Sequence, residues 1–66
     1  MDLILLQKED DMAIIRGLHT GTMYALSHSA GIGWFIVKSK NENGFWTEFP
    51  RTKLEPDVVK ELGLPS

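Results

Sequence analysis

The residues of this sequence best suited to chemistry are two histidines and the hydroxyl groups beside one of them. His19 and His28 are the only histidines, and Ser27 and Ser29 flank the second. A zinc site needs three or four ligands placed together, and a nucleophilic serine needs a base and a third, orienting group. There is no cysteine, and neighbours in sequence do not supply that geometry. We therefore predict no catalytic residue, no metal site and no cofactor.

Glycines and acids do not change this prediction. Gly31 and Gly33 lead into the apolar run 34–37, whereas a phosphate-binding loop places its glycines before the first turn of a helix. The acidic cluster Glu9, Asp10 and Asp11 lacks the alternating ligands and distal glutamate of a calcium loop. Tight turns explain both features.

Aromatic residues near basic ones form the remaining candidate site. Rings beside cations can hold single-stranded nucleic acid, because bases stack on the rings and phosphates meet the charges. Exposed Trp and Tyr also concentrate the energy of protein recognition. The same rings could instead build the core of a small β domain. The residues that we predict to bind a partner are Tyr24, Trp34, Lys38, Lys40, Trp46 and Arg51.

These residues need a scaffold, and its centre is a predicted β-hairpin over residues 33–50. Asn43-Gly44 suits a tight turn, and the flanking runs are β-branched or aromatic. A two-residue or a four-residue loop gives the same two faces. One face would hold Trp34, Ile36, Lys38, Lys40, Phe45, Thr47 and Phe49, and the other Phe35, Val37, Ser39, Trp46 and Glu48.

The remaining elements are predicted from local patterns. Residues 3–7 and 12–17 are short apolar runs around a polar turn, and 22–26 contains Thr and Tyr, so we predict three more strands. Residues 27–33 are rich in Ser and Gly and are expected to form a loop. Pro56 at a first helical position and Gly63 at a left-handed cap predict a short C-terminal helix.

The predicted fold is mainly β, a small α+β domain spanning residues 1–66. It is a five-stranded antiparallel meander or an SH3-like small barrel with a short C-terminal helix. Both faces of the hairpin carry large apolar groups, so we expect both to be covered. The helix would cover one face, and closure into a barrel or a second copy of the chain would cover the other.

Composition narrows the functional classes. The chain has 66 residues and a net charge of −2, which argues mildly against general nucleic-acid coating. The charge is uneven, because acidic ends flank a basic middle that contains Arg16, Lys38, Lys40, Arg51 and Lys53. The run Leu3 to Leu6 is too short for a signal peptide or a membrane span. We expect a cytoplasmic protein with no membrane partner.

The leading functional prediction is a non-enzymatic interaction module of the inhibitor, antitoxin or adaptor type. It would bind a macromolecular partner, first of all a protein, through an exposed sheet face. A second copy of the chain, forming a homodimer, is a further predicted partner. The alternative is single-stranded nucleic-acid binding by the same aromatic and basic residues. A hydrolase built on Ser27 or His28 is a third class with little support in the sequence.

Overall fold

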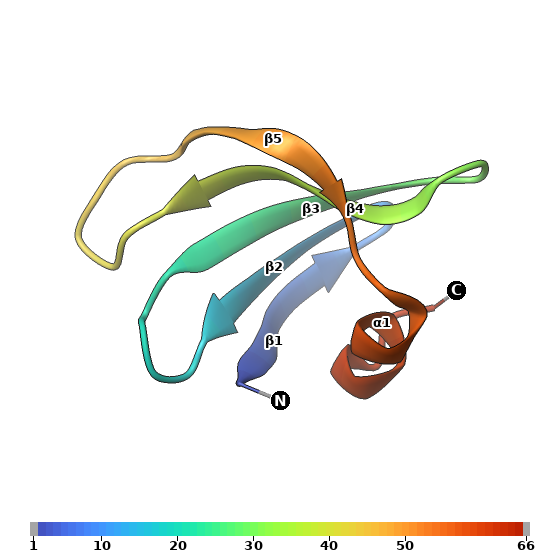
Figure 1. Cartoon of the computed structure of the whole chain (residues 1–66), viewed down its shortest axis with the longest axis horizontal. Coiled ribbons are helices and arrows are strands. Elements are labelled where there is room, and N and C mark those ends of the chain that lie inside the picture. Colours follow the sequence, from blue (N-terminus) through green and yellow to red (C-terminus); the bar gives the residue numbers. More distant parts are fainter. Residues whose placement is uncertain (1, 66) are drawn as a thin grey trace.

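The computed structural model describes residues 2–65, which form a meander of five antiparallel strands and a helix. Each strand pairs with the next one along the chain, so β1 and β5 are the edges of the sheet (Figure 1). The strands are β1 (Leu3–Glu9), β2 (Met12–Gly17), β3 (Met23–Ser29), β4 (Gly33–Lys40) and β5 (Thr47–Lys53). The predicted antiparallel meander is confirmed, and the sheet is not closed into a barrel.

Several boundaries differ from the sequence prediction. Strand β1 runs to Glu9, two residues beyond its predicted end, and β3 begins at Met23 instead of residue 22. Strand β3 continues through Ser27, His28 and Ser29, where a loop was expected, because these residues pair with the start of β4 from Gly33 to Phe35. Ser and His have only moderate intrinsic preferences for any secondary structure. Hydrogen-bonded pairing with β4 therefore determines their strand conformation.

The β4–β5 connection is also longer than either predicted loop. β4 ends at Lys40 and β5 begins at Thr47. The Gly44 N–H donates to the Asn41 carbonyl at 3.0 Å, so Gly44 occupies the fourth position of a β-turn, a position where glycine is common. Neither Asn43 nor Gly44 has a positive φ, and the predicted two-residue Asn-Gly turn is therefore wrong.

The C-terminal helix was predicted correctly in place and in both ends. Helix α1 (Pro56–Leu62) begins with its proline and is followed by Gly63 at φ 78°. The Leu64 N–H donates to the Val59 carbonyl at 3.1 Å, as in a Schellman ending. This ending turns Leu64 back beneath the helix, where it is buried.

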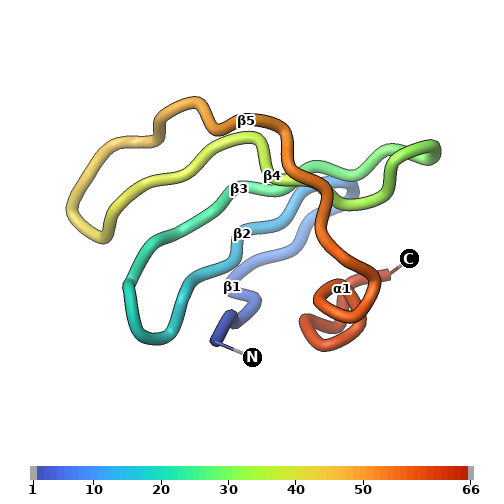
Figure 2. Tube along the Cα trace, viewed as in Figure 1, coloured from blue at the N-terminus to red at the C-terminus, as the bar shows by residue number. Residues whose placement is uncertain are grey.

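The core lies between α1 and one side of the sheet, which we call the inner face. Ile15 and Leu26 are fully buried there, and Trp34 is 2% exposed. The Trp34 indole N–H donates to the Pro65 carbonyl at 2.7 Å, which ties the last described residue to the sheet. Figure 2 shows the helix on one side of the sheet, beyond the end of β5, and its backbone lies near that of β1. The predicted docking of the helix on one sheet face is confirmed.

The opposite side of the sheet, which we call the outer face, is not covered by any element within residues 2–65 (Figure 1). The expectation that a closed barrel would cover it is wrong, because β1 and β5 stay apart at the two edges. Coverage by a second copy of the chain stays a prediction.

A β-bulge in β4 changes which hairpin side chains share a face. Ile36 pairs with Leu26 and Lys38 with Ala25, so Val37 is an extra residue in the ladder. One extra residue reverses the alternation of side chains beyond it. Lys38 and Lys40 therefore share the face of Phe35 and not that of Trp34 and Ile36, which corrects the predicted assignment.

Candidate binding face

The strand register arranges the outer face in three rows that cross the sheet. Residues directly opposite each other in an antiparallel pair lie on the same face. The rows, each in strand order, are Ile4, Arg16, Met23 and Lys40; then Gln7, Ile14, Ala25, Lys38 and Glu48; then Glu9, Met12, Ser27, Phe35 and Lys53. Apart from Arg16 and Ser27, the β2 and β3 positions of these rows are apolar, and Lys38, Lys40 and Lys53 place most of the cations on β4 and β5.

Two cationic side chains lie over aromatic rings on this face. The Lys40 ammonium is 5.5 Å from the centre of the Trp46 ring, and the Arg51 guanidinium is 5.7 Å from that of Phe35. Both distances are within the range of cation–π attraction. Phe35 is buried although no element covers it, because neighbouring side chains such as Arg51 shield the ring.

A hollow of 250 Å³ lies in the outer face. Its apolar lining includes Met12, Ile14 and Ala25, and Lys38 and Trp46 close it on the side of β4 and β5. Trp46 is 37% exposed, and its neighbour Phe45 is 91% exposed. The hollow therefore combines an apolar floor with a cation and an accessible ring, a combination suited to receiving a side chain of a partner.

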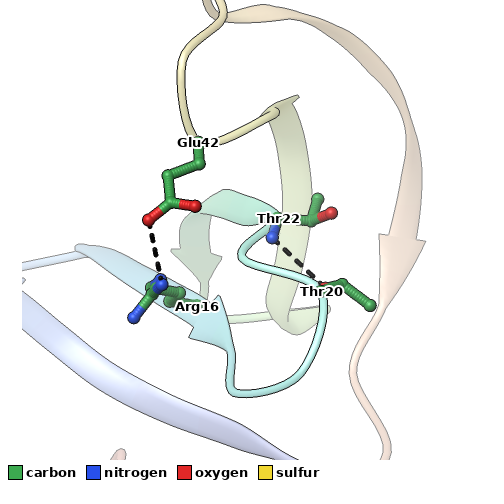
Figure 3. Close-up of polar contacts among 4 residues, drawn as sticks. All are labelled: Arg16, Thr20, Thr22 and Glu42. Atoms are coloured by element: carbon green, nitrogen blue, oxygen red, sulfur yellow. Dashed lines mark hydrogen bonds and ion pairs between the residues drawn. The ribbon is translucent and has the colours of Figure 1, made fainter.

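Arg16 is already partly neutralised. Its guanidinium lies 3.2 Å from a carboxylate oxygen of Glu42, which reaches it from the β4–β5 loop (Figure 3). Beside this pair, the Thr22 N–H donates to the Thr20 hydroxyl at 3.2 Å and shapes the β2–β3 turn (Figure 3). Of the other cations on the outer face, Lys38, Arg51 and Lys53 are exposed, and Lys40 is half-buried over the Trp46 ring.

The six residues predicted to bind a partner are divided between the two faces. Lys38, Lys40, Trp46 and Arg51 lie together on the outer face. Trp34 is in the core, and Tyr24 is half-buried on the inner face with its ring edge-on to Phe49 at 5.8 Å. Trp34 and Tyr24 therefore act in packing, because their strand register points them toward the helix side.

Met12, Ile14 and Phe35 belong to the outer face but were not among the predicted binding residues. For Met12 and Ile14 the sequence does contain a signal, because they and Arg16 occupy every second position of β2 and must share one face. That signal defines one face without telling which face the helix will cover. Only the packing of α1 identifies Ala13 and Ile15 as the inner pair.

The potential catalytic groups do not come together. Ser27 and His28 are consecutive residues of β3, so their side chains point to opposite faces. The His28 ring lies 5.1 Å from the Trp34 ring and 3.7 Å from an Asp11 carboxylate oxygen. His19 approaches Asp2 at 3.5 Å at the other end of β2. Within residues 2–65, no group of three or more His, Cys, Asp or Glu side chains is placed to hold a metal ion.

Comparison of the chain with protein-family models, with curated proteins and with solved structures gave no significant match. Among the described residues, no helix has the length and apolarity needed to span a membrane.

Proposed function

We propose that this protein is a non-enzymatic interaction module that binds an acidic protein surface through its outer face. The observation that carries the proposal is the open face itself, with an apolar centre and cations along β4 and β5. Apolar contact would supply affinity, and the cations would select and orient an acidic partner. Such modules commonly serve as inhibitors, antitoxins or adaptors.

Charge complementarity supports an acidic partner over a neutral one. On the outer face the cations outnumber the acids even when Glu42, which pairs with Arg16, is included. The cations are Arg16, Lys38, Lys40, Arg51 and Lys53, and the acids are Glu9, Glu42 and Glu48. The chain as a whole carries −2, so this excess is local to the face. Local excess of one sign steers the approach of a partner of the opposite sign.

The test has two stages. A photo-crosslinking residue is placed at Ile14 on the outer face and, as a matched control, at Glu61 on the exposed side of α1. The crosslinked partner is then purified, and its affinity for the protein is measured at two salt concentrations. We expect crosslinks from position 14 and not from position 61.

Replacing Lys38 and Lys40 together with alanine should then weaken binding about tenfold, or ~1.4 kcal/mol, and flatten its salt dependence. Lys8→Ala, which removes an exposed lysine from β1, should leave both unchanged. If the double variant binds with unchanged strength and salt dependence, the proposal is wrong.

A second candidate is single-stranded nucleic-acid binding by the same face. The observation that favours it is the pair of accessible rings, Phe45 at 91% and Trp46 at 37% exposure, beside Lys40. Titration of a labelled oligonucleotide at two salt concentrations tests it, because phosphate contacts weaken steeply with salt. Absence of binding at low salt removes this candidate.

A second copy of the chain is the rival occupant of the outer face. Light scattering over a range of protein concentrations measures the mass in solution. A monomer leaves the face open for another partner. A dimer whose contacts map to Ile14 and Phe35 would replace the proposed protein partner by self-association.

A further inference from the structure

We propose a second binding site, separate from the outer face, for a small amphiphilic carboxylate such as a free medium-chain fatty acid. The site is a groove of 470 Å³ between α1 and the part of the sheet where β4 begins and β5 ends. Of the residues that line the groove, Lys53 is also paired with Phe35 at the edge of the outer face. The tests below therefore use Lys60 and Ile32, which do not belong to that face, so that this proposal can fail independently of partner binding by the outer face.

Three features of the chain form the groove. After β5 the chain passes through Leu54 and Glu55 into α1, and the Leu54 N–H is held by the Trp34 carbonyl at 3.0 Å. The left-handed Gly63 returns Leu64 beneath the helix. Ile32, in the β3–β4 turn, forms an exposed lip at 45% exposure.

The walls of the groove are almost entirely apolar. Trp34 is a lining residue but is only 2% exposed, and its indole N–H donates to the Pro65 carbonyl. The accessible aliphatic surface comes mainly from Ile32, Pro56 and Val59, with the buried Leu54 and Leu64 behind it. These walls would bury a hydrocarbon body, and hydrocarbon gains most from leaving water.

Among residues 2–65, the charged residues that line the groove are Lys53, at the end of β5, and Lys60, on α1. The acids of the same region, Glu55, Asp57 and Glu61, do not line it. A ligand with one anionic end would therefore meet complementary charge, whereas a cationic amphiphile would meet repulsion. The volume falls in the range of ordinary small-molecule sites, roughly 300 to 1,000 Å³.

Trp34 provides a direct optical probe of the groove. The chain has two tryptophans, so a Trp46→Phe background leaves Trp34 as the sole indole emitter. Titration with decanoate, below its micelle-forming concentration, should change this emission in a saturable way. Shifts of backbone amide signals in NMR should be concentrated at Ile32, Leu54 and Val59.

Two ligand series test the chemistry. Shortening decanoate to octanoate should weaken binding roughly fourfold for each methylene that leaves the groove. Decyltrimethylammonium keeps the hydrocarbon chain and reverses the charge, and it should bind at least fivefold more weakly than decanoate.

Two variants test the residues. Lys60→Gln should weaken decanoate binding about two- to fivefold, the effect typical of one exposed charge, and Lys8→Gln serves as the matched control with no change. Ile32→Ser should weaken binding by a similar factor. Because both side chains are exposed, the fold should survive each substitution.

Absence of a saturable response to decanoate would overturn the proposal. So would equal binding of decanoate and decyltrimethylammonium, because the lysines would then not select the ligand. Shifts concentrated at Met12, Ile14 and Ala25 would also overturn it, since they would place the ligand in the outer-face hollow.

Discussion

The two faces of the sheet both carry large apolar side chains but reach different environments. The inner face places Ile15, Leu26 and Trp34 beneath α1, where each is almost completely buried. The outer face places Ile14, Ala25 and Phe35 in corresponding positions without a covering element in residues 2–65. The comparison shows that an apolar sheet face can be shielded by a second layer or by long side chains of its own.

The kind of shielding determines what each face can do. A helix packed over aliphatic side chains excludes water and fixes them, so the inner face stabilises the fold. Arg51 over Phe35 and Lys40 over Trp46 form a cover that is charged and can move aside. A cover of this kind is compatible with the partner binding that we propose for the outer face.

The largest expected effect comes from a pair of neighbouring isoleucines in β2. Ile15→Ala should lower the free energy of unfolding by about 2 to 5 kcal/mol, because it leaves a cavity in the core. Ile14→Ala, on the outer face, should cost about 1 kcal/mol. Urea unfolding followed by far-UV circular dichroism measures both.

If the Ile15→Ala variant does not fold, Ile15→Val and Ile14→Val allow the same comparison of unfolding free energies with smaller expected losses. Equal costs for the two positions would show that the outer face is as tightly packed as the inner one. Repeating the measurement at two protein concentrations would then tell whether a second copy provides that packing.

A smaller difference in the free energy of unfolding is expected between substitutions of the two tryptophans. Trp34→Phe removes both the indole hydrogen bond to Pro65 and part of the core volume, so we expect a loss of about 2 kcal/mol. Trp46→Phe, on the exposed loop before β5, should change stability by no more than ~0.5 kcal/mol. Denaturant midpoints measured by circular dichroism give both values. A large loss for Trp46→Phe would show that the outer ring is structural.

The smallest effect is expected at the Arg16–Glu42 pair. Both side chains are substantially exposed, so Arg16→Gln and Glu42→Gln should each alter stability by less than ~0.5 kcal/mol. Glu42→Gln should nevertheless strengthen binding of an acidic partner, because it frees the Arg16 charge. Calorimetric titration with the purified partner measures this change, and weaker binding by Glu42→Gln would contradict it.

The sequence predicted the elements better than it predicted the faces of the hairpin. Strand β2 and helix α1 were placed correctly, because the apolar run in 12–17 and the Pro56 and Gly63 signals are local. The faces of Lys38 and Lys40 were assigned wrongly, since a bulge at Val37 has no clear signature in the residues around it. The predicted binding set accordingly mixed the outer residues Lys38, Lys40, Trp46 and Arg51 with the inner residues Tyr24 and Trp34.

By itself, the sequence determined a β-rich chain of five strands with a capped C-terminal helix. These features follow from side-chain alternation, from β-branched and aromatic runs, and from glycine and proline at positions with special backbone angles. The tertiary structure alone decided that the sheet stays open, which face α1 covers, and on which side the lysines lie. Those outcomes depend on long-range pairing register and on helix docking, and one inserted residue in one strand reverses every side chain beyond it.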